Sequence, residues 1–148
     1  MSHPSSPRVL VVEDELLQLH LLDAVLRKAL PGAEIDHAQF LAEAVARVIE
    51  GRYDLVLLDL WLPDATGFDA LERLVALTDT PIVVRAGRMN GTLQEVGREH
   101  GAFDVVDKSA VPRDVLDAVR RALAGPADLA GPVDAAADGR VAVVADVA

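Results

Sequence analysis

The sequence predicts an α/β fold, a three-layer sandwich built around a five-stranded parallel sheet. Apolar runs of four or five residues recur along the chain and are separated by longer segments with helical periodicity. Most of these runs are apolar without alternation, which is typical of parallel strands that helices cover on both faces. Regular alternation of such strands with helices favours a three-layer α/β sandwich.

Five strands are expected, at residues 8–12, 34–38, 54–58, 82–85 and 103–106. Each is followed by an expected helix, at residues 15–30, 41–50, 68–77, 92–100 and 112–124. The first helix stops at Pro31, and Gly51 is placed to cap the second. Pro81 introduces the fourth strand, and Pro112 lies in the first turn of the fifth helix, where proline is tolerated. Gly97 inside the fourth helix predicts that this helix is weak and mobile.

The chain of 148 residues is long enough for one domain with a substantial core. We expect residues 8–124 to form this domain and residues 1–7 to be a flexible lead-in. Residues 125–148 are rich in Ala, Gly, Pro and Asp, so we expect a flexible tail. This tail is too short for a helix-turn-helix domain, which predicts a stand-alone or truncated module.

Composition excludes several classes of protein. The net charge of −10 argues against a nucleic-acid surface, which needs a basic patch. The absence of cysteine excludes disulfides and thiolate metal sites. No apolar stretch approaches the roughly 18 residues of a membrane span, and the first residues lack the apolar core of a secretory signal. The expected compartment is therefore the cytoplasm.

Charged residues follow three of the expected strands. Glu13 and Asp14 follow the first strand, Asp59 follows the third, and Lys108 follows the fifth. Right-handed crossovers leave few topologies, and the strand order 2-1-3-4-5 places the first strand beside the third. The acidic residues then converge at the carboxyl edge of the sheet, and a long lysine can reach them from the fifth strand. Two acidic clusters and a lysine predict a pocket for a divalent cation beside a phosphoryl group.

Three motifs in this order resemble the receiver domain of bacterial two-component response regulators. They are the segment Val11-Val12-Glu13-Asp14-Glu15, the segment 57–67 that begins Leu57-Leu58-Asp59, and Gly101-Ala102 leading to Lys108-Ser109. The resemblance covers residues 8–124. It implies a flavodoxin-like receiver fold, and the expected strand order is partly taken from it.

The resemblance also implies a role for each residue of the pocket. Asp59 would be the phosphoacceptor, which takes a phosphoryl group from a phosphohistidine on a sensor histidine kinase or a phosphotransfer protein. Asp14 and Asp59 would be direct ligands of Mg²⁺, Glu13 would act through a water, and the backbone carbonyl of Trp61 would complete the metal site. Lys108 would pair with the phosphoryl oxygens.

Two positions depart from the pattern of the family. Ala86 stands where receivers usually have a Ser or Thr hydroxyl that moves inward on phosphorylation. Val105 replaces the Tyr or Phe that moves between outward and buried positions, and valine has one stiff torsion and no ring. We therefore expect an intact phosphorylation pocket with an atypical output. Arg85 or Arg88 could supply a substitute donor to the phosphoryl group, because a guanidinium matches phosphate well.

Three functions remain open at this stage. The first is a phosphorylatable receiver that reaches a downstream protein through the face formed by residues 92–100, 103–106 and 112–124, with homodimerisation also open. The second is a pseudo-receiver that binds proteins independently of phosphorylation. The third is an aspartate-nucleophile phosphatase, which would need an acid/base aspartate two residues after Asp59, where Trp61 stands. We therefore expect that the protein is not an enzyme.

Overall fold

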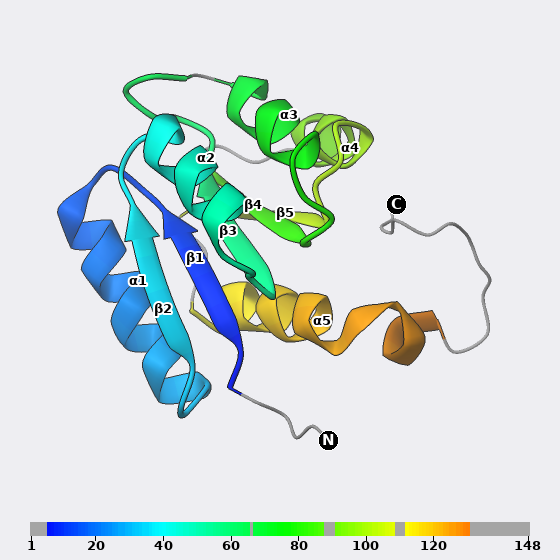
Figure 1. Cartoon of the computed structure of the whole chain (residues 1–148). Coiled ribbons are helices and arrows are strands. Elements are labelled where there is room, and N and C mark those ends of the chain that lie inside the picture. The colour runs from blue at the N-terminus through cyan, green and yellow to red at the C-terminus, as the bar shows by residue number, and fades with distance from the viewer. Residues whose placement is uncertain (1–5, 66, 88–90, 109–111, 131–148) are drawn as a thin grey trace.

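The computed structural model describes residues 6–65, 67–87, 91–108 and 112–130, and it confirms the predicted fold class. The five strands are parallel and lie in the order β2-β1-β3-β4-β5 (Figure 1). The strands are β1 Arg8–Val12, β2 Glu34–Ala38, β3 Leu55–Asp59, β4 Ile82–Ala86 and β5 Asp104–Asp107. The helices are α1 Leu16–Ala29, α2 Leu41–Glu50, α3 Asp69–Val75, α4 Gly91–Glu99 and α5 Pro112–Ala130.

Helices cover both faces of the sheet and create two apolar cores. α1 and α5 pack on one face, where Leu26 and Val119 meet strand residues such as Leu57. α2, α3 and α4 cover the other face (Figure 1), where Leu71 is among the fully buried side chains. Alternate residues of each strand point into opposite cores, as the pleat of a strand requires. No helix within the described ranges is long and apolar enough to cross a membrane.

The boundaries of the elements differ from the expected ones mostly by one or two residues. Asp59 is the last residue of β3 rather than the residue after it. α5 contains a break at Gly125, whose φ is 83°, and continues to Ala130. The segment 125–130 is therefore helical beyond this break, although we expected the tail to begin there. The rest of the expected tail, residues 131–148, and residues 1–5 of the lead-in lie outside the described residues.

α4 packs tightly on β5 through Gly97. This glycine is buried, and a Cβ added to it would collide with Cγ2 of Val105. The glycine therefore allows the helix to approach the strand closely, a role that the sequence alone does not reveal. The greater mobility expected for α4 stays a prediction.

We expect Gly97→Ala to lower the free energy of unfolding by about 1 kcal/mol, because overpacking typically costs about 1–3 kcal/mol and the gain in helix propensity is smaller. Urea unfolding measures this change. Val105→Ala opens space at the contact, so the same glycine substitution should be neutral or stabilising in that background. A stabilising effect of Gly97→Ala in the natural sequence would contradict the tight contact.

Asp104 joins α4 and α5 to β5. Its buried carboxylate accepts hydrogen bonds from Arg98 of α4 at 2.8 Å and from Arg121 of α5 at 2.7 Å. The backbone N–H of Val105 donates a third bond at 2.8 Å. Burial alone would raise the pKa of Asp104, but the hydrogen bonds from Arg121, Arg98 and Val105 outweigh burial and lower it.

This arrangement predicts that Asp104 contributes stability that is lost in acid. A carboxyl group whose pKa is lowered in the folded state stabilises fully above its unfolded pKa of about 4, and the contribution disappears as the pH falls through the folded pKa. Asp104→Asn should therefore lower the free energy of unfolding by about 1–3 kcal/mol at neutral pH and by less below the unfolded pKa. Urea unfolding at neutral pH and at a pH below about 4 tests this. Asp79 is exposed, so Asp79→Asn is a control that should change the free energy of unfolding little at either pH. An equal loss at both pH values would contradict the role of the charge.

Candidate functional site

The candidate site lies at the carboxyl edge of the sheet, where β1, β3 and β4 are neighbours. Val12 of β1 is in register with Leu58 of β3, so the residues that follow them, Glu13 and Asp59, lie side by side. Asp59 is in turn in register with Arg85 of β4. Residues in register on neighbouring strands share one face of the sheet. One row across three strands therefore contains two carboxylates and a guanidinium.

The structure brings together the three acidic residues singled out in the sequence. Glu13, Asp14 and Asp59 each offer a carboxylate oxygen, and these oxygens lie within 4.8 Å of one another. Glu13 and Asp59 are almost fully buried, whereas Asp14 is exposed at the mouth of the cluster. Parallel strands with this order bring the two acidic segments to the same edge, because β1 and β3 are direct neighbours.

Lys108 reaches the same cluster from the end of β5. Its backbone N–H donates to the carbonyl of Ala86 at 2.8 Å, which continues the β4–β5 ladder by one residue. The side-chain Nζ then lies 3.3 Å from Oδ2 of Asp59 and 3.6 Å from Oε1 of Glu13. The long side chain thus spans the distance between β5 and the carboxylates.

Arg85 is the member of the cluster whose contact with Glu13 the sequence analysis missed. Its side chain is 5% exposed and lies 3.1 Å from Oε1 of Glu13. It also donates to Oε1 of Gln18 at 3.0 Å and to the backbone carbonyl of Lys108 at 3.4 Å. The sequence predicts Arg85 or Arg88 only as a donor to a phosphoryl group, and Arg88 lies outside the described residues. The available signal was a charged residue inside an otherwise apolar strand.

Burial and mutual charge shift the ionisation of this cluster. The pKa of Glu13 is raised to about 7: burial is the largest cause, the negative charge of Asp59 acts in the same direction, and Lys108 opposes both. Burial also lowers the pKa of Arg85, against the opposing effect of Glu13 and Asp59. The charges of the cluster therefore interact strongly, because Glu13, Asp59 and Arg85 are buried from solvent.

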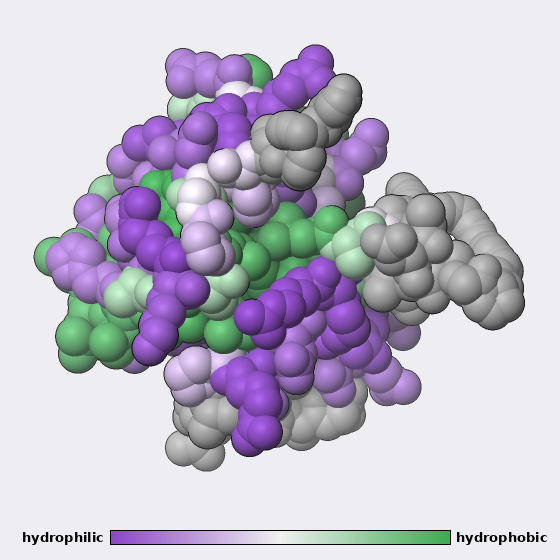
Figure 2. Space-filling view, turned by 90° about the horizontal axis from the view of Figure 1, so that it is seen from below, coloured by the Kyte–Doolittle hydropathy of each residue, from purple (hydrophilic) through white to green (hydrophobic). Residues whose placement is uncertain are grey.

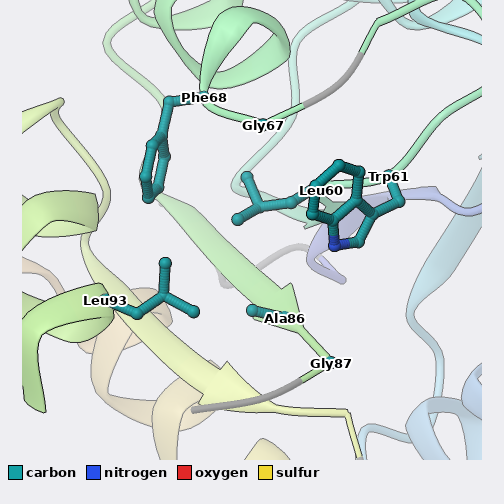
Figure 3. Close-up of a pocket in the computed structure, with 7 residues that line it drawn as sticks. All are labelled: Leu60, Trp61, Gly67, Phe68, Ala86, Gly87 and Leu93. Atoms are coloured by element: carbon teal, nitrogen blue, oxygen red, sulfur yellow. The ribbon is translucent and has the colours of Figure 1, made fainter. Parts of the chain in front are cut away.

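Trp61 contributes its backbone to the site and leaves its side chain at the surface. Its N–H donates to Oδ1 of Asp59 at 3.1 Å, so both oxygens of Asp59 have a hydrogen-bond donor. The indole is 57% exposed. It lines a pocket of about 480 Å³ together with Leu60, Gly67, Phe68, Ala86, Gly87 and Leu93. Figure 3 shows Leu60 and Trp61 on one side of this space and Phe68 and Leu93 on the other.

The two positions that we expect to depart from the family pattern belong to the apolar core that α2, α3 and α4 cover. Ala86 and Val105 are both 1% exposed and are members of the same core cluster. Ala86 ends β4 beneath the pocket (Figure 3) and presents a methyl group to it. Val105 is held against Gly97 of α4. Two residues that line the pocket, Leu60 and Ala86, directly follow Asp59 and Arg85 of the charged cluster in the chain.

The donor set fits a hard divalent cation. Three carboxylates with oxygens this close repel one another, and Mg²⁺ prefers such oxygen ligands while it keeps several waters. Glu13 is less available than Asp14, because its Oε1 accepts from Arg85 and its Oε2 accepts from the backbone N–H of Glu15 at 3.2 Å. Glu13 is thus suited to act through a water rather than as a direct ligand.

Comparison with known proteins identifies the family. The family model of the response regulator receiver domain matches residues 9–120, so the chain belongs to this family. The transcriptional regulatory protein ResD of Bacillus subtilis is 31% identical over 123 residues, which are 83% of this chain and 50% of ResD. The DNA-binding response regulator MtrA of Mycobacterium tuberculosis H37Rv is 36% identical over 118 residues, 78% of this chain and 50% of MtrA. The chain thus spans about half the length of these relatives.

Similarity extends to enzyme-linked receivers and to solved structures. A protein-glutamate methylesterase/protein-glutamine glutaminase of Anaeromyxobacter dehalogenans is 34% identical over 106 residues, 70% of this chain but 30% of that protein. The crystal structure of a CheY-like receiver domain protein from Methanospirillum hungatei superposes with a TM-score of 0.73 at 26% identity, and covers 81% of this chain and 95% of that one. The identification as a two-component receiver is therefore confirmed by sequence and by fold.

The geometry predicts that Asp59 controls the ionisation of Glu13. Asp59→Asn removes a neighbouring negative charge, so we expect the pKa of Glu13 to fall by about one pH unit. Carbon-detected NMR titration of the Glu13 carboxyl group, without divalent cations, measures this. Asp36→Asn, at the partly buried middle of β2, changes a carboxylate outside the cluster and should leave the titration unchanged. An unchanged pKa in Asp59→Asn would contradict the close interaction of the two groups.

Proposed function

We propose that this receiver accepts a phosphoryl group on Asp59 from a phosphohistidine of a sensor histidine kinase or a phosphotransfer protein. The observation that carries the proposal is the setting of Asp59, a buried carboxylate 3.3 Å from the Nζ of Lys108 and within 4.8 Å of two further carboxylates. Membership of the receiver family supports the same assignment. Asp59 is thereby the candidate nucleophile and Lys108 the candidate partner of the transferred group.

The proposed reaction is an exchange of one phosphorus bond for another. An oxygen of Asp59 forms a bond to phosphorus while the phosphorus–nitrogen bond of the phosphohistidine breaks, and the leaving imidazole nitrogen keeps the electron pair of that bond. The product is an acyl phosphate on Asp59. Lys108 then pairs with a phosphoryl oxygen, which stabilises the charge that spreads over these oxygens during transfer.

Asp14 and Asp59 would hold Mg²⁺ directly, with Glu13 acting through a water and the backbone carbonyl of Trp61 completing the set. The bound ion would neutralise charge on the phosphoryl oxygens and relieve the repulsion among the carboxylates. The residues of the chain supply the rest: the backbone N–H of Trp61 and the Nζ of Lys108 orient the two oxygens of Asp59.

An apolar surface beside the pocket suits a protein partner. Leu16, Leu17 and Leu21 of α1 are each more than half exposed, and α1 begins directly after the acidic segment of the site. Figure 2, which views the molecule from the opposite end to the pocket, shows that apolar surface continues on the side where α1 lies. A partner that covers these leucines would bring its phosphohistidine to Asp59. Such an encounter would take place in the cytoplasm.

The output of this receiver is proposed to be atypical. A methyl group at Ala86 cannot donate to a phosphoryl oxygen, and Val105, which packs against Gly97, has no ring to move between two positions. Phosphorylation would then act through the β4–α4 connection instead of a hydroxyl and a ring. The surface of α4, β5 and α5 is the proposed contact for a downstream protein, and a homodimer through it is an alternative assembly.

The second candidate is a pseudo-receiver that binds a protein partner regardless of phosphorylation. The observation in its favour is that Ala86 and Val105, both buried in the apolar core, provide neither the hydroxyl nor the aromatic ring that usually moves on phosphorylation. A phosphatase has less support, because Trp61 stands where the second aspartate of such an enzyme is needed and its side chain transfers no proton. Hydrolysis of an aryl phosphate by the chain would support the phosphatase alternative.

Incubation with acetyl phosphate and MgCl₂ should add one phosphoryl group to the natural chain and none to Asp59→Ala, as followed by intact-mass spectrometry over time. Without Mg²⁺ the rate should fall by about two orders of magnitude or more, because the three carboxylates otherwise repel the anionic donor. Asp36→Ala, outside the cluster, is the matched control and should react like the natural chain. Absence of a phosphoryl or beryllofluoride adduct under all these conditions would overturn the phosphoacceptor assignment and favour the pseudo-receiver.

A further inference from the structure

A buried arginine shares the acidic pocket with the carboxylates that are proposed to hold the metal. Arg85 lies in register with Asp59 on the neighbouring strand, so its side chain leaves the sheet on the same face. From there it reaches Glu13, one strand further away, with 3.1 Å between Nη1 and Oε1. The sheet register therefore places Arg85 and Glu13 together, and their ion pair is buried rather than exposed at the surface.

The arginine is held in this position by two further acceptors. Nη2 donates to Oε1 of Gln18 in α1 at 3.0 Å and to the backbone carbonyl of Lys108 at 3.4 Å. Arg85 is 4% exposed and has Val84 and Ala86 as buried strand neighbours. A guanidinium stays protonated under ordinary conditions, so the pocket contains a permanent positive charge that is fixed by strand, helix and loop.

This charge acts on Glu13 more than on any other carboxylate for which a contact is observed. Oε1 of Glu13 faces Arg85 and, at 3.6 Å, Lys108, while Oε2 accepts from the N–H of Glu15. Each acceptor oxygen is therefore engaged by the protein itself. When all three carboxylates are ionised, Lys108 alone would leave a net charge of two negative units in the pocket, and Arg85 reduces it to one.

We propose that Arg85 competes with a divalent cation for the negative charge of Glu13 and so weakens Mg²⁺ binding at this pocket. The inference rests on the proposed function, because it concerns the regulation of the same metal site. A cation that approaches the carboxylates is repelled by the fixed guanidinium, and the engaged oxygens of Glu13 attract it less. Phosphorylation is thereby limited to conditions in which Mg²⁺ is abundant, or in which a partner draws Arg85 away from Glu13.

Isothermal titration calorimetry with MgCl₂ alone tests the proposal without any phosphodonor. Arg85→Leu replaces the guanidinium with an apolar side chain that suits the strand, and Arg85→Gln keeps a hydrogen-bond donor for Glu13 without the charge. Both should bind Mg²⁺ at least about fivefold more tightly than the natural chain at about pH 8. Arg27→Leu is the matched control, since Arg27 pairs with Asp23 in the last turn of α1 and carries the same charge. Its affinity should stay within about twofold of the natural value.

A second comparison isolates the route through Glu13. In a Glu13→Gln background the gain in affinity from Arg85→Leu should shrink at least about threefold, because the charge for which arginine and cation compete is gone. An equal gain in both backgrounds, or an affinity of Arg85→Leu and Arg85→Gln no tighter than that of the natural chain, would overturn the inference.

The inference and the proposed function fail in different experiments. A phosphoryl adduct on Asp59 together with unchanged Mg²⁺ affinity in both Arg85 variants overturns the inference alone. Tighter Mg²⁺ binding in these variants with no adduct on Asp59 supports the role of Arg85 and overturns the phosphoacceptor assignment alone. Where Arg85→Leu does not fold, Arg85→Gln decides the outcome by the same measurement.

Discussion

Electrostatic compensation at one edge of a parallel sheet is the constraint on which the rest of this structure depends. The register of β1, β3 and β4 forces Glu13 and Asp59 to lie side by side away from bulk water. Two carboxylates buried side by side repel each other, and burial with this repulsion raises the pKa of Glu13. Lys108 and Arg85 arrive from β5 and β4 to balance them. The N–H of Trp61 and the Nζ of Lys108 each donate to one oxygen of Asp59, so the carboxylate is held in one orientation, which suits a nucleophile.

A second group of contacts packs α4 and α5 on β5, the strand that leads to Lys108. Asp104 holds both helices through Arg98 and Arg121, and Gly97 brings α4 into direct contact with Val105. β5 therefore carries Lys108 toward the pocket from a firmly packed base. Val105 and Ala86 are buried in the same apolar core, and the side chain of Ala86 has no polar atom. The charged cluster and the α4–β5 contact therefore lie at two ends of β5, with Lys108 at one and Val105 facing Gly97 at the other.

Much of the fold and most of the site follow from local patterns in the sequence. Continuous apolar runs predicted the parallel strands, and the acidic residues at two strand ends predicted where the carboxylates meet, because strand order alone brings those ends together. The position of Lys108 beside Asp59 needed only the length of its side chain. Residue type is read directly from the sequence, whereas the strand order that brings these ends together was expected partly from the family resemblance.

The contacts that the sequence did not reveal depend on distances between elements. Arg85 was recognisable as a charge in an apolar strand, but its pairing with Glu13 follows from the register of three strands and from the place of Gln18 on α1. Gly97 suggested a weak helix, whereas its close contact with Val105 becomes visible only when α4 is packed on β5. The helical turn after Gly125 was missed because a glycine with a positive φ is the usual end of a helix.

A crystal structure of the chain grown with MgCl₂ and beryllofluoride tests the central claim most directly. We expect a beryllofluoride group bonded to Asp59, with Lys108 against one of its fluorines and a metal ion among Asp14, Asp59 and the backbone carbonyl of Trp61. An unmodified Asp59 in crystals soaked with both components, or a metal ion bound elsewhere with Lys108 turned away from Asp59, would contradict the claim that this charged cluster is a phosphoryl-accepting site.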